Sequence, residues 1–144
     1  MKCMAPVSDA AMAVVSFSLV DIERLLPKIE KMVLKLQVLD TAIEMLESVE
    51  LDVDSESRGH VQYVIKFNKE FHKLCYKYYN LAEKLELQGV ILQDIEDGIV
   101  DFPYIYRGKR VMLCWQMGEK KIGHWHEEDE CYEGRKKIVN LEIR

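Results

Sequence analysis

The 144-residue chain lacks three features, and each absence excludes a class of protein. No apolar run approaches the ~20 residues of a membrane-spanning helix, and the apolar stretch 10–15 lacks the basic flank and cleavage site of a signal peptide. Basic residues are not in excess, because 25 acids against 20 bases give a net charge of −5, which disfavours a protein that grips phosphate backbones. The four cysteines contain no CxxC pair, which excludes a zinc-finger pattern. We therefore predict a cytoplasmic protein with reduced thiols and with neither a membrane nor a nucleic-acid partner.

The residues that are present are those of one globular domain. Hydrophobic residues make up 49% of the chain and charged residues 31%, so the chain can bury a core and remain charged outside. We predict a flexible N-terminal extension over residues 1–16 and a single domain over residues 17–144. Within the domain, residues 17–89 are predicted to form a helical hairpin and residues 90–144 a small β-sheet part.

Spacing predicts the first helix. Ser18 can cap free N–H groups, and Asp21 follows three residues later, as in a capping box. Apolar residues then recur in steps of three and four as a heptad seam at Leu19, Ile22, Leu26, Ile29, Val33 and Leu36. The seam resumes after a slip at Leu39. Pro27 lies inside this pattern and predicts a kink or a short first segment.

A second helix is predicted from His60 to Gln88, with Gly89 as its C-terminal stop. Its seam consists of Val64, Phe67, Phe71, Leu74, Tyr78, Leu81 and Leu85. The acidic stretch 50–59 reads as the loop between the helices, so the pair should form an antiparallel hairpin. Because two such seams exceed what a small sheet can cover, we expect a second copy of the chain to bury the remainder in a four-helix core.

After Gly89 the pattern becomes that of strands. Residues 99–106 and 111–117 alternate around a turn at 107–109, and residues 121–126 read as a third strand. The short apolar run 90–92 precedes these strands, and the tail 138–143 is a candidate for one more. Pro103 cannot donate to a ladder, so its strand should be an edge at that point. The predicted fold class is α+β, a long antiparallel two-helix hairpin followed by a small antiparallel β-meander.

Turn lengths also predict a register. Pairing Tyr104 with Val111 and Trp115 with His124 places both histidines on the apolar face that covers the helices. That face would consist of Val100, Phe102, Tyr104, Val111, Leu113, Trp115, Ile122, His124 and His126. Asp101, Cys114 and Trp125 would lie on the opposite face.

Several short motifs together resemble a known family. They are Phe17-Ser18-Leu19, Leu25-Leu26-Pro27, Gly98-Ile99-Val100-Asp101-Phe102-Pro103, Leu113-Cys114-Trp115-Gln116-Met117-Gly118-Glu119, Trp125-His126-Glu127 with Asp129, and Gly134-Arg135. In order and spacing, over roughly residues 17–137, the chain is similar to the family called domain of unknown function 2203. The resemblance implies a recurring signature but no activity. The chain departs from the family pattern at His124, where an aromatic residue is usual, and at Cys131, where glycine is expected.

The sharpest chemical interpretation is a metal site. His124 and His126 are two residues apart on a predicted strand and so share a face. Asp129 or Glu128 in the next turn is a candidate third ligand, with Cys114 or Cys131 nearby. Histidine and carboxylate ligands suit a divalent transition metal such as zinc, iron or manganese. The alternative is a polar strand end in which His126 is satisfied by Asp129 or by a backbone carbonyl.

Three other groups have a functional and a structural interpretation, and the structural one is favoured for each. Asp101, Glu119, Asp129 and Arg135 form either an acid–base or anion site or a set of turn and ion-pair contacts. Cys114 is either a nucleophile beside a histidine or an inert core residue. The basic row on the second helix is either a nucleic-acid stripe, with Tyr76 and Tyr79 beside it, or a solvated face formed by Lys66, Lys69, Lys73, Lys77 and Lys84.

The sequence thus favours a homodimeric helical scaffold or interaction module. Its binding surface is expected at the sheet end, with the candidate residues Asp101, Trp115, Glu119, Trp125, His126, Asp129 and Arg135. The alternative is a metal-dependent enzyme, hydrolytic or redox, with His124, His126 and Asp129 as ligands. Whether the chain is an enzyme is left open.

Overall fold

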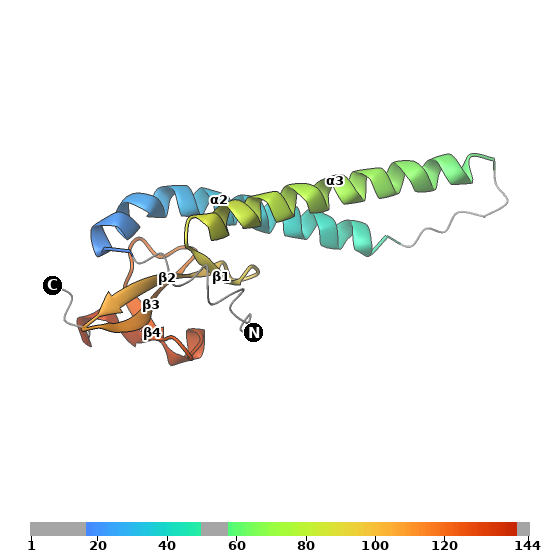
Figure 1. Ribbon diagram of the computed structural model, residues 1–144. Helices are drawn as coiled ribbons and strands as arrows, with labels where there is room; N and C mark the ends of the chain where they lie inside the picture. Colours follow the sequence, from blue (N-terminus) through green and yellow to red (C-terminus); the bar gives the residue numbers. More distant parts are fainter. Residues whose placement is uncertain (1–16, 50–57, 141–144) are drawn as a thin grey trace.

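The computed structural model describes residues 17–49 and 58–140 and has the predicted α+β architecture (Figure 1). Two long helices come first, α2 (Leu19–Glu47) and α3 (His60–Leu87). Five strands then form one antiparallel sheet in the order β1-β2-β3-β4-β5: β1 (Ile91–Asp94), β2 (Ile99–Tyr106), β3 (Lys109–Gln116), β4 (His124–Glu127) and β5 (Lys136–Lys137). The 3-10 helices η1 (Tyr132–Gly134) and η2 (Ile138–Asn140) flank β5. The predicted extension 1–16 and most of the predicted loop 50–59 lie outside the described residues.

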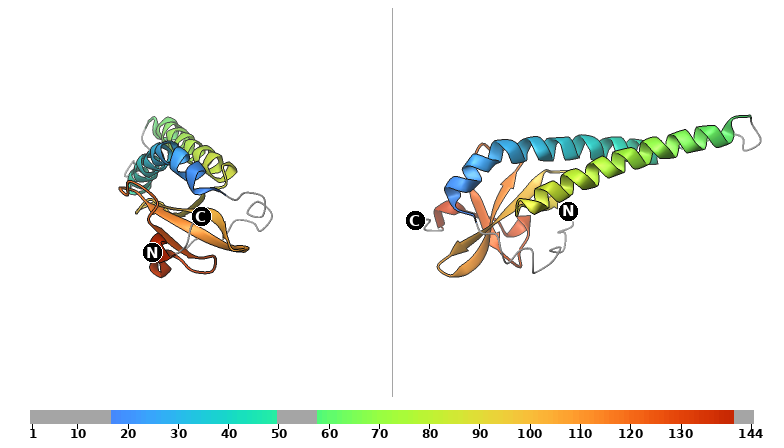
Figure 2. Two further views of the ribbon diagram at one scale, coloured as in Figure 1. Left: turned by 90° about the vertical axis from the view of Figure 1, so that its left-hand side faces the viewer. Right: turned by 45° about the horizontal axis from the view of Figure 1, so that its top comes forward.

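Helix α2 begins at the predicted cap. The Ser18 hydroxyl accepts from the Asp21 backbone N–H at 3.1 Å, and the Asp21 carboxylate accepts from the Ser18 backbone N–H at 3.3 Å, which completes the capping box. The helix is not interrupted at Pro27, so the predicted short first segment is wrong, although α2 bends in its N-terminal part (Figure 2). Its buried residues are Ile22, Leu26, Ile29, Met32, Val33 and Leu36, which include five of the six predicted seam positions.

The two helices cover the sheet only over part of their length. The N-terminal part of α2 and the C-terminal part of α3 lie over the sheet, and the rest of both helices extends beyond it (Figure 1). In α3 only Leu85 is buried, and the predicted seam residues Val64, Phe67, Phe71 and Leu74 are half-buried. In the described ranges, neither helix is long and apolar enough to span a membrane.

One face of the sheet forms the core with the helices. Val100, Phe102, Val111, Leu113 and Trp115 pack there against the buried face of α2 and against Leu85. Alternation along β2 and β3 places these side chains on one side and sends Asp101, Met112 and Cys114 to the other. The predicted core face is therefore correct for β2 and β3.

Two strand predictions need correction, and a third is confirmed. The third predicted strand, 121–126, is shorter and later, at His124–Glu127, and residues 138–140 of the predicted tail strand form η2 instead. Pro103 is confirmed at a locally open edge: β1 pairs with β2 only as far as Asp101, and the outward Pro103 carbonyl accepts from the Phe17 backbone N–H at 3.0 Å.

Candidate functional site

The register between β3 and β4 differs from the predicted one by a single residue. His124 pairs with Cys114 rather than with Trp115, and His126 pairs with Met112. Because side chains alternate between the faces of a sheet, this slip inverts every side chain of β4. Both histidines therefore leave the helix-facing side, and Trp125 replaces them there, packed against the core. The prediction that the histidines and Asp101 lie on different faces is wrong.

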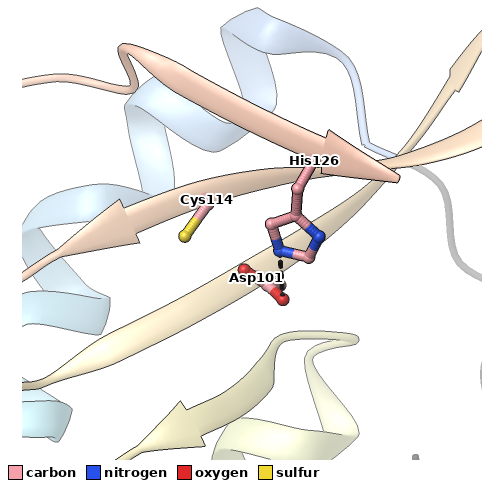
Figure 3. Close-up of side chains that lie close together, drawn as sticks. All are labelled: Asp101, Cys114 and His126. Atoms are coloured by element: carbon pink, nitrogen blue, oxygen red, sulfur yellow. Dashed lines mark hydrogen bonds and ion pairs between the residues drawn. The ribbon is translucent and has the colours of Figure 1, made fainter. Parts of the chain in front are cut away.

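The inverted register brings three polar side chains together on the face away from the helices. Asp101 comes from β2, Cys114 from β3 and His126 from β4, and their side chains converge (Figure 3). All three are buried, with exposed fractions of 0%, 0% and 1%. One ligand-type atom of each lies within 4.8 Å of the others. We refer to Asp101, Cys114 and His126 as the polar cluster.

An ion pair links the outer two strands of the polar cluster. His126 Nε2 lies 2.9 Å from Asp101 Oδ2, and His126 Nδ1 lies 2.7 Å from the Glu127 carbonyl oxygen. Burial alone would lower the pKa of His126, but the hydrogen bond and the charge of Asp101, together with the Glu127 carbonyl, raise it above the usual value. The Gln93 side-chain amide, at the bulge of β1, also donates to Asp101 Oδ2 at 2.7 Å. Asp101 Oδ1, in contrast, is buried and has no hydrogen-bond partner among the described residues.

The Cys114 thiol is held in its protonated form. Burial and the neighbouring Asp101 carboxylate raise its pKa far above the ordinary range, and Arg135 only partly opposes them.

The cysteines differ in oxidation state. Cys114 and Cys75 are free thiols, as predicted. Cys131 is disulfide-bonded, so the prediction of reduced thiols is wrong for that residue.

The polar cluster does not have the arrangement of a cysteine–histidine catalytic dyad. In such a dyad one ring nitrogen takes the thiol proton while the other is oriented by a carboxylate or amide. Here Nε2 faces Asp101 and Nδ1 faces a backbone carbonyl, so neither nitrogen is left to accept the proton of Cys114. Because the thiol is also buried, nucleophilic catalysis by Cys114 has no support in this geometry.

A second group surrounds Arg135 on the same side of the sheet. Arg135 Nη2 donates to Glu119 Oε1 at 2.7 Å and to His124 Nδ1 at 2.8 Å, and its guanidinium lies over the Tyr132 ring at 4.7 Å. The same ring nitrogen of His124 lies 3.3 Å from Glu119 Oε2, so His124 is placed between the guanidinium and the carboxylate. Glu119 also closes the turn after β3, because its Oε1 accepts from the Gln116 backbone N–H at 2.7 Å. We refer to Glu119, His124, Tyr132 and Arg135 as the arginine cluster.

The structure does not bring the three predicted metal ligands together. His126 belongs to the polar cluster, His124 belongs to the arginine cluster, and Asp129 is exposed at the turn after β4. The positive charge of Arg135 next to His124 also opposes a cation there. Among the described residues, the one group of three or more histidine, cysteine or carboxylate side chains close enough to hold an ion is the polar cluster.

The predicted binding-surface residues also separate by burial. Asp101, Trp115 and His126 are buried, and of these three only Trp115 lines a cleft. The Trp115 indole instead donates to the Glu119 carbonyl at 2.8 Å. Of the others, Glu119, Trp125 and Arg135 are partly exposed and Asp129 is exposed. An open cleft of about 490 Å³ lies beside Glu119, between α2 and the connection from β3 to β4, and is lined by Glu23, Leu26, Pro27, Glu30, Trp115, Gly118, Glu119, Lys120 and Lys121.

The sequence reasoning missed Gln93 and the proximity of Cys114 to the Asp101–His126 pair. The signal available for the second was the requirement that a buried histidine has a partner, which only the opposite face of the sheet provides. For Gln93 there was no signal, because its reach depends on the irregular pairing between Leu92 and Asp94.

A family model described as "Uncharacterized conserved protein (DUF2203)" matches residues 16–138. The chain belongs to this family. No curated protein and no solved structure matches the chain. The DUF2203 match extends over both helices and all five strands, so it includes the polar cluster and the arginine cluster. Membership confirms the resemblance found in the sequence and assigns no activity.

Proposed function

We propose that this DUF2203 protein is a homodimeric helical scaffold whose hairpins associate through α2. The supporting observation is an exposed apolar stripe on the part of α2 that extends beyond the sheet. Leu34, Val38, Met45 and Val49 are 44–66% exposed. Leu34, Val38 and Met45 lie on one face of α2, distinct from the face buried in the core, and Val49 follows at the same spacing just beyond the helix end at Glu47 and its C-cap Ser48. We refer to these four residues as the α2 stripe.

A second copy of the chain fits the α2 stripe because the stripe is symmetric about the point midway between Thr41 and Ala42. When two α2 helices pair antiparallel about a two-fold axis at that point, Leu34 lies opposite the partner copy's Val49, and Val38 lies opposite its Met45. The same patch then serves both subunits, as a two-fold interface requires. Each copy contributes two helices, which gives the four-helix assembly expected from the sequence.

The apolar area of the α2 stripe determines the protein concentration at which the proposed dimer should form. Complete burial of an aliphatic side chain contributes about 1.5–3 kcal/mol. The stripe residues are about half exposed at the outset, so eight side chains contribute about 6–12 kcal/mol. After an association cost of at least about 4 kcal/mol, at most about 8 kcal/mol remains, which corresponds to a dissociation constant of about 1 μM or weaker. The dimer should therefore be sought at tens of micromolar.

Dimerisation through α2 would leave the sheet end of each subunit available as the binding surface. The supporting feature is the cleft beside Glu119, which contains both acidic and basic side chains. These groups suit a polar partner rather than an apolar one.

The test compares two substitutions of equal type and exposure. Val38 in the α2 stripe and Val61 on α3 are each 63% exposed, so aspartate should be tolerated equally at both in an isolated subunit. Sedimentation at increasing concentration should give twice 16.9 kDa for the wild type and for Val61→Asp, but 16.9 kDa for Val38→Asp. A wild type that stays monomeric at tens of micromolar would refute the proposal. If Val61→Asp dissociates the dimer and Val38→Asp does not, the interface lies on α3 rather than on α2.

A cross-linking measurement locates the axis independently. In a Cys75→Ser background, Thr41→Cys places a thiol beside its own copy across the two-fold axis, so a short thiol-reactive linker should join two subunits. Val61→Cys in the same background is the control and should not cross-link. Equal cross-linking of both variants would show random collision rather than a two-fold axis next to Thr41.

A further inference from the structure

We infer that the polar cluster is a buried site for a transition metal ion, best suited to zinc. Asp101 Oδ1, Cys114 Sγ and His126 Nε2 are the donor atoms, one from each of three adjacent strands. Of the three ligands that the sequence indicated, His124, His126 and Asp129, only His126 belongs to this set. The site is independent of the proposed dimer, whose α2 stripe lies on another part of the molecule.

The first support is a carboxylate oxygen without a partner. Asp101 Oδ1 is buried and receives no hydrogen bond of good geometry within the described residues, although the other oxygen of the same carboxylate receives two. The Cys114 thiol is a further, weaker donor toward this carboxylate, and metal binding would remove its proton. A buried anionic acceptor that is left unsatisfied costs free energy and is uncommon in folded proteins. A cation beside Oδ1 removes that cost.

The second support is the position of two groups that hydrogen-bond to the proposed ligands, the Glu127 carbonyl and the Gln93 amide. Metal-bound histidines usually donate their other ring N–H to a carbonyl or carboxylate, which orients the ring. His126 Nδ1 is 2.7 Å from the Glu127 carbonyl, which leaves Nε2 as the atom directed into the polar cluster. The Gln93 amide holds Asp101 Oδ2 in the same way and leaves Oδ1 for the ion. The first ligands are thus oriented before an ion is present.

Charge and ligand type select the metal. A dication with a thiolate, a carboxylate and a neutral imidazole has a net charge of zero, which suits a fully buried site. Binding releases the thiol proton of Cys114 and the Nε2 proton of His126 to solvent. Thiolate and imidazole favour zinc over magnesium or calcium, which prefer oxygen ligands. Zinc bonds of about 2.0–2.3 Å place neighbouring donor atoms roughly 3.5 Å apart, so the present 4.8 Å limit must close by about 1 Å.

Because the polar cluster is closed to solvent, the ion would stabilise the sheet rather than bind a substrate. It would tie β2, β3 and β4 together on the side that the helices do not cover. Structural zinc sites contribute directly to folding free energy, so its removal should lower the melting temperature.

The test is metal content and cobalt spectroscopy of the full-length chain, with paired controls. Protein produced with added zinc should carry about one ion per chain. Cys114→Ser and His126→Gln should lose it, while Cys75→Ser and His124→Gln retain it. After chelation, Co²⁺ should give the intense near-ultraviolet absorption of thiolate coordination in the wild type and in Cys75→Ser, but not in Cys114→Ser.

Each result decides the inference. A wild type that contains no zinc, shows no Co²⁺ absorption band and keeps its melting temperature in chelator overturns it. Metal that persists in Cys114→Ser, or that is lost in His124→Gln, overturns this set of ligands. If Cys114→Ser fails to fold, the wild-type Co²⁺ spectrum and His124→Gln still decide, because neither measurement needs that variant.

Discussion

Replacing Asp101 with leucine measures how strongly the buried pair joins β2 to β4. Asp101 and His126 are 0% and 1% exposed, and their side chains meet at 2.9 Å. Removing the carboxylate leaves a buried imidazole without its acceptor and takes the same acceptor from Gln93. Removal of one partner of a buried ion pair costs about 3–5 kcal/mol. Since a domain of this kind is stable by about 5–15 kcal/mol, the loss is large.

The double variant Asp101→Leu/His126→Leu gives the coupling energy between the two residues. His126→Leu alone leaves a buried carboxylate and should cost a similar amount, so the two single costs sum to about 6–10 kcal/mol. In Asp101→Leu/His126→Leu both charges are gone, and apolar replacement of a buried pair is often close to neutral. The remaining cost is the acceptor lost to the Gln93 amide, about 1–3 kcal/mol. The coupling between the two sites should therefore exceed about 3 kcal/mol.

Urea unfolding followed by circular dichroism is the assay, with chelator present so that no bound ion contributes. Asp129→Leu is the control, because Asp129 is exposed and its replacement should change the unfolding free energy by less than about 0.5 kcal/mol. Additivity of the two single costs within about 0.5 kcal/mol would refute a direct Asp101–His126 interaction. It would also refute the β3–β4 register, which brings these residues together.

Two further substitutions test the packing that positions the sheet, each against a matched control in urea unfolding. Gly98 has φ +65°, and an added Cβ would lie 2.7 Å from the Met117 Cβ, whereas Gly108 has φ +75° and open space. Gly98→Ala should therefore lower the unfolding free energy by about 2–4 kcal/mol, and Gly108→Ala by only about 1–2 kcal/mol. Equal losses would contradict the close contact between the β1–β2 turn and Met117. Ser18→Ala should cost about 1 kcal/mol by removing the α2 cap, while Ser48→Ala, which loses only a hydroxyl bond to the Met45 carbonyl, should cost less. A larger loss at Ser48 would show that the capping box contributes little.

The parts of the fold that local chemistry determines were predictable. Ser18 caps helix α2 because the capping box needs only residues 18–21, which are consecutive in the sequence. The apolar seam of the helix follows from helical spacing. The β2–β3 register was predicted correctly because residues Arg107 and Gly108 form a two-residue turn, which sets the pairing of both strands. In each case the interactions that decide the structure are close together in the sequence.

The candidate site was only partly predictable, because it depends on a longer connection. Residues 117–123 join β3 to β4, and a connection of that length does not set a register. His126 was identified from its residue type, but its neighbours were assigned to the wrong face by one residue of slip. The exposed α2 stripe was also missed as a distinct feature, because the heptad seam explained the excess of apolar residues without it.

For the register of β4, turn length and hydrogen-bond satisfaction give opposite predictions, and the structure agrees with hydrogen-bond satisfaction. Turn length placed His124 and His126 against the apolar core, where no polar partner exists, and each unpaired ring would have cost about 1–3 kcal/mol. The observed register places Trp125 there, and both histidines face the carboxylate and guanidinium groups of the other side. Two unpaired rings outweigh the small cost of one more loop residue, because loop closure depends only weakly on length. For a short strand of alternating polar and aromatic residues, hydrogen-bond satisfaction is therefore the better predictor of register than the length of the preceding turn.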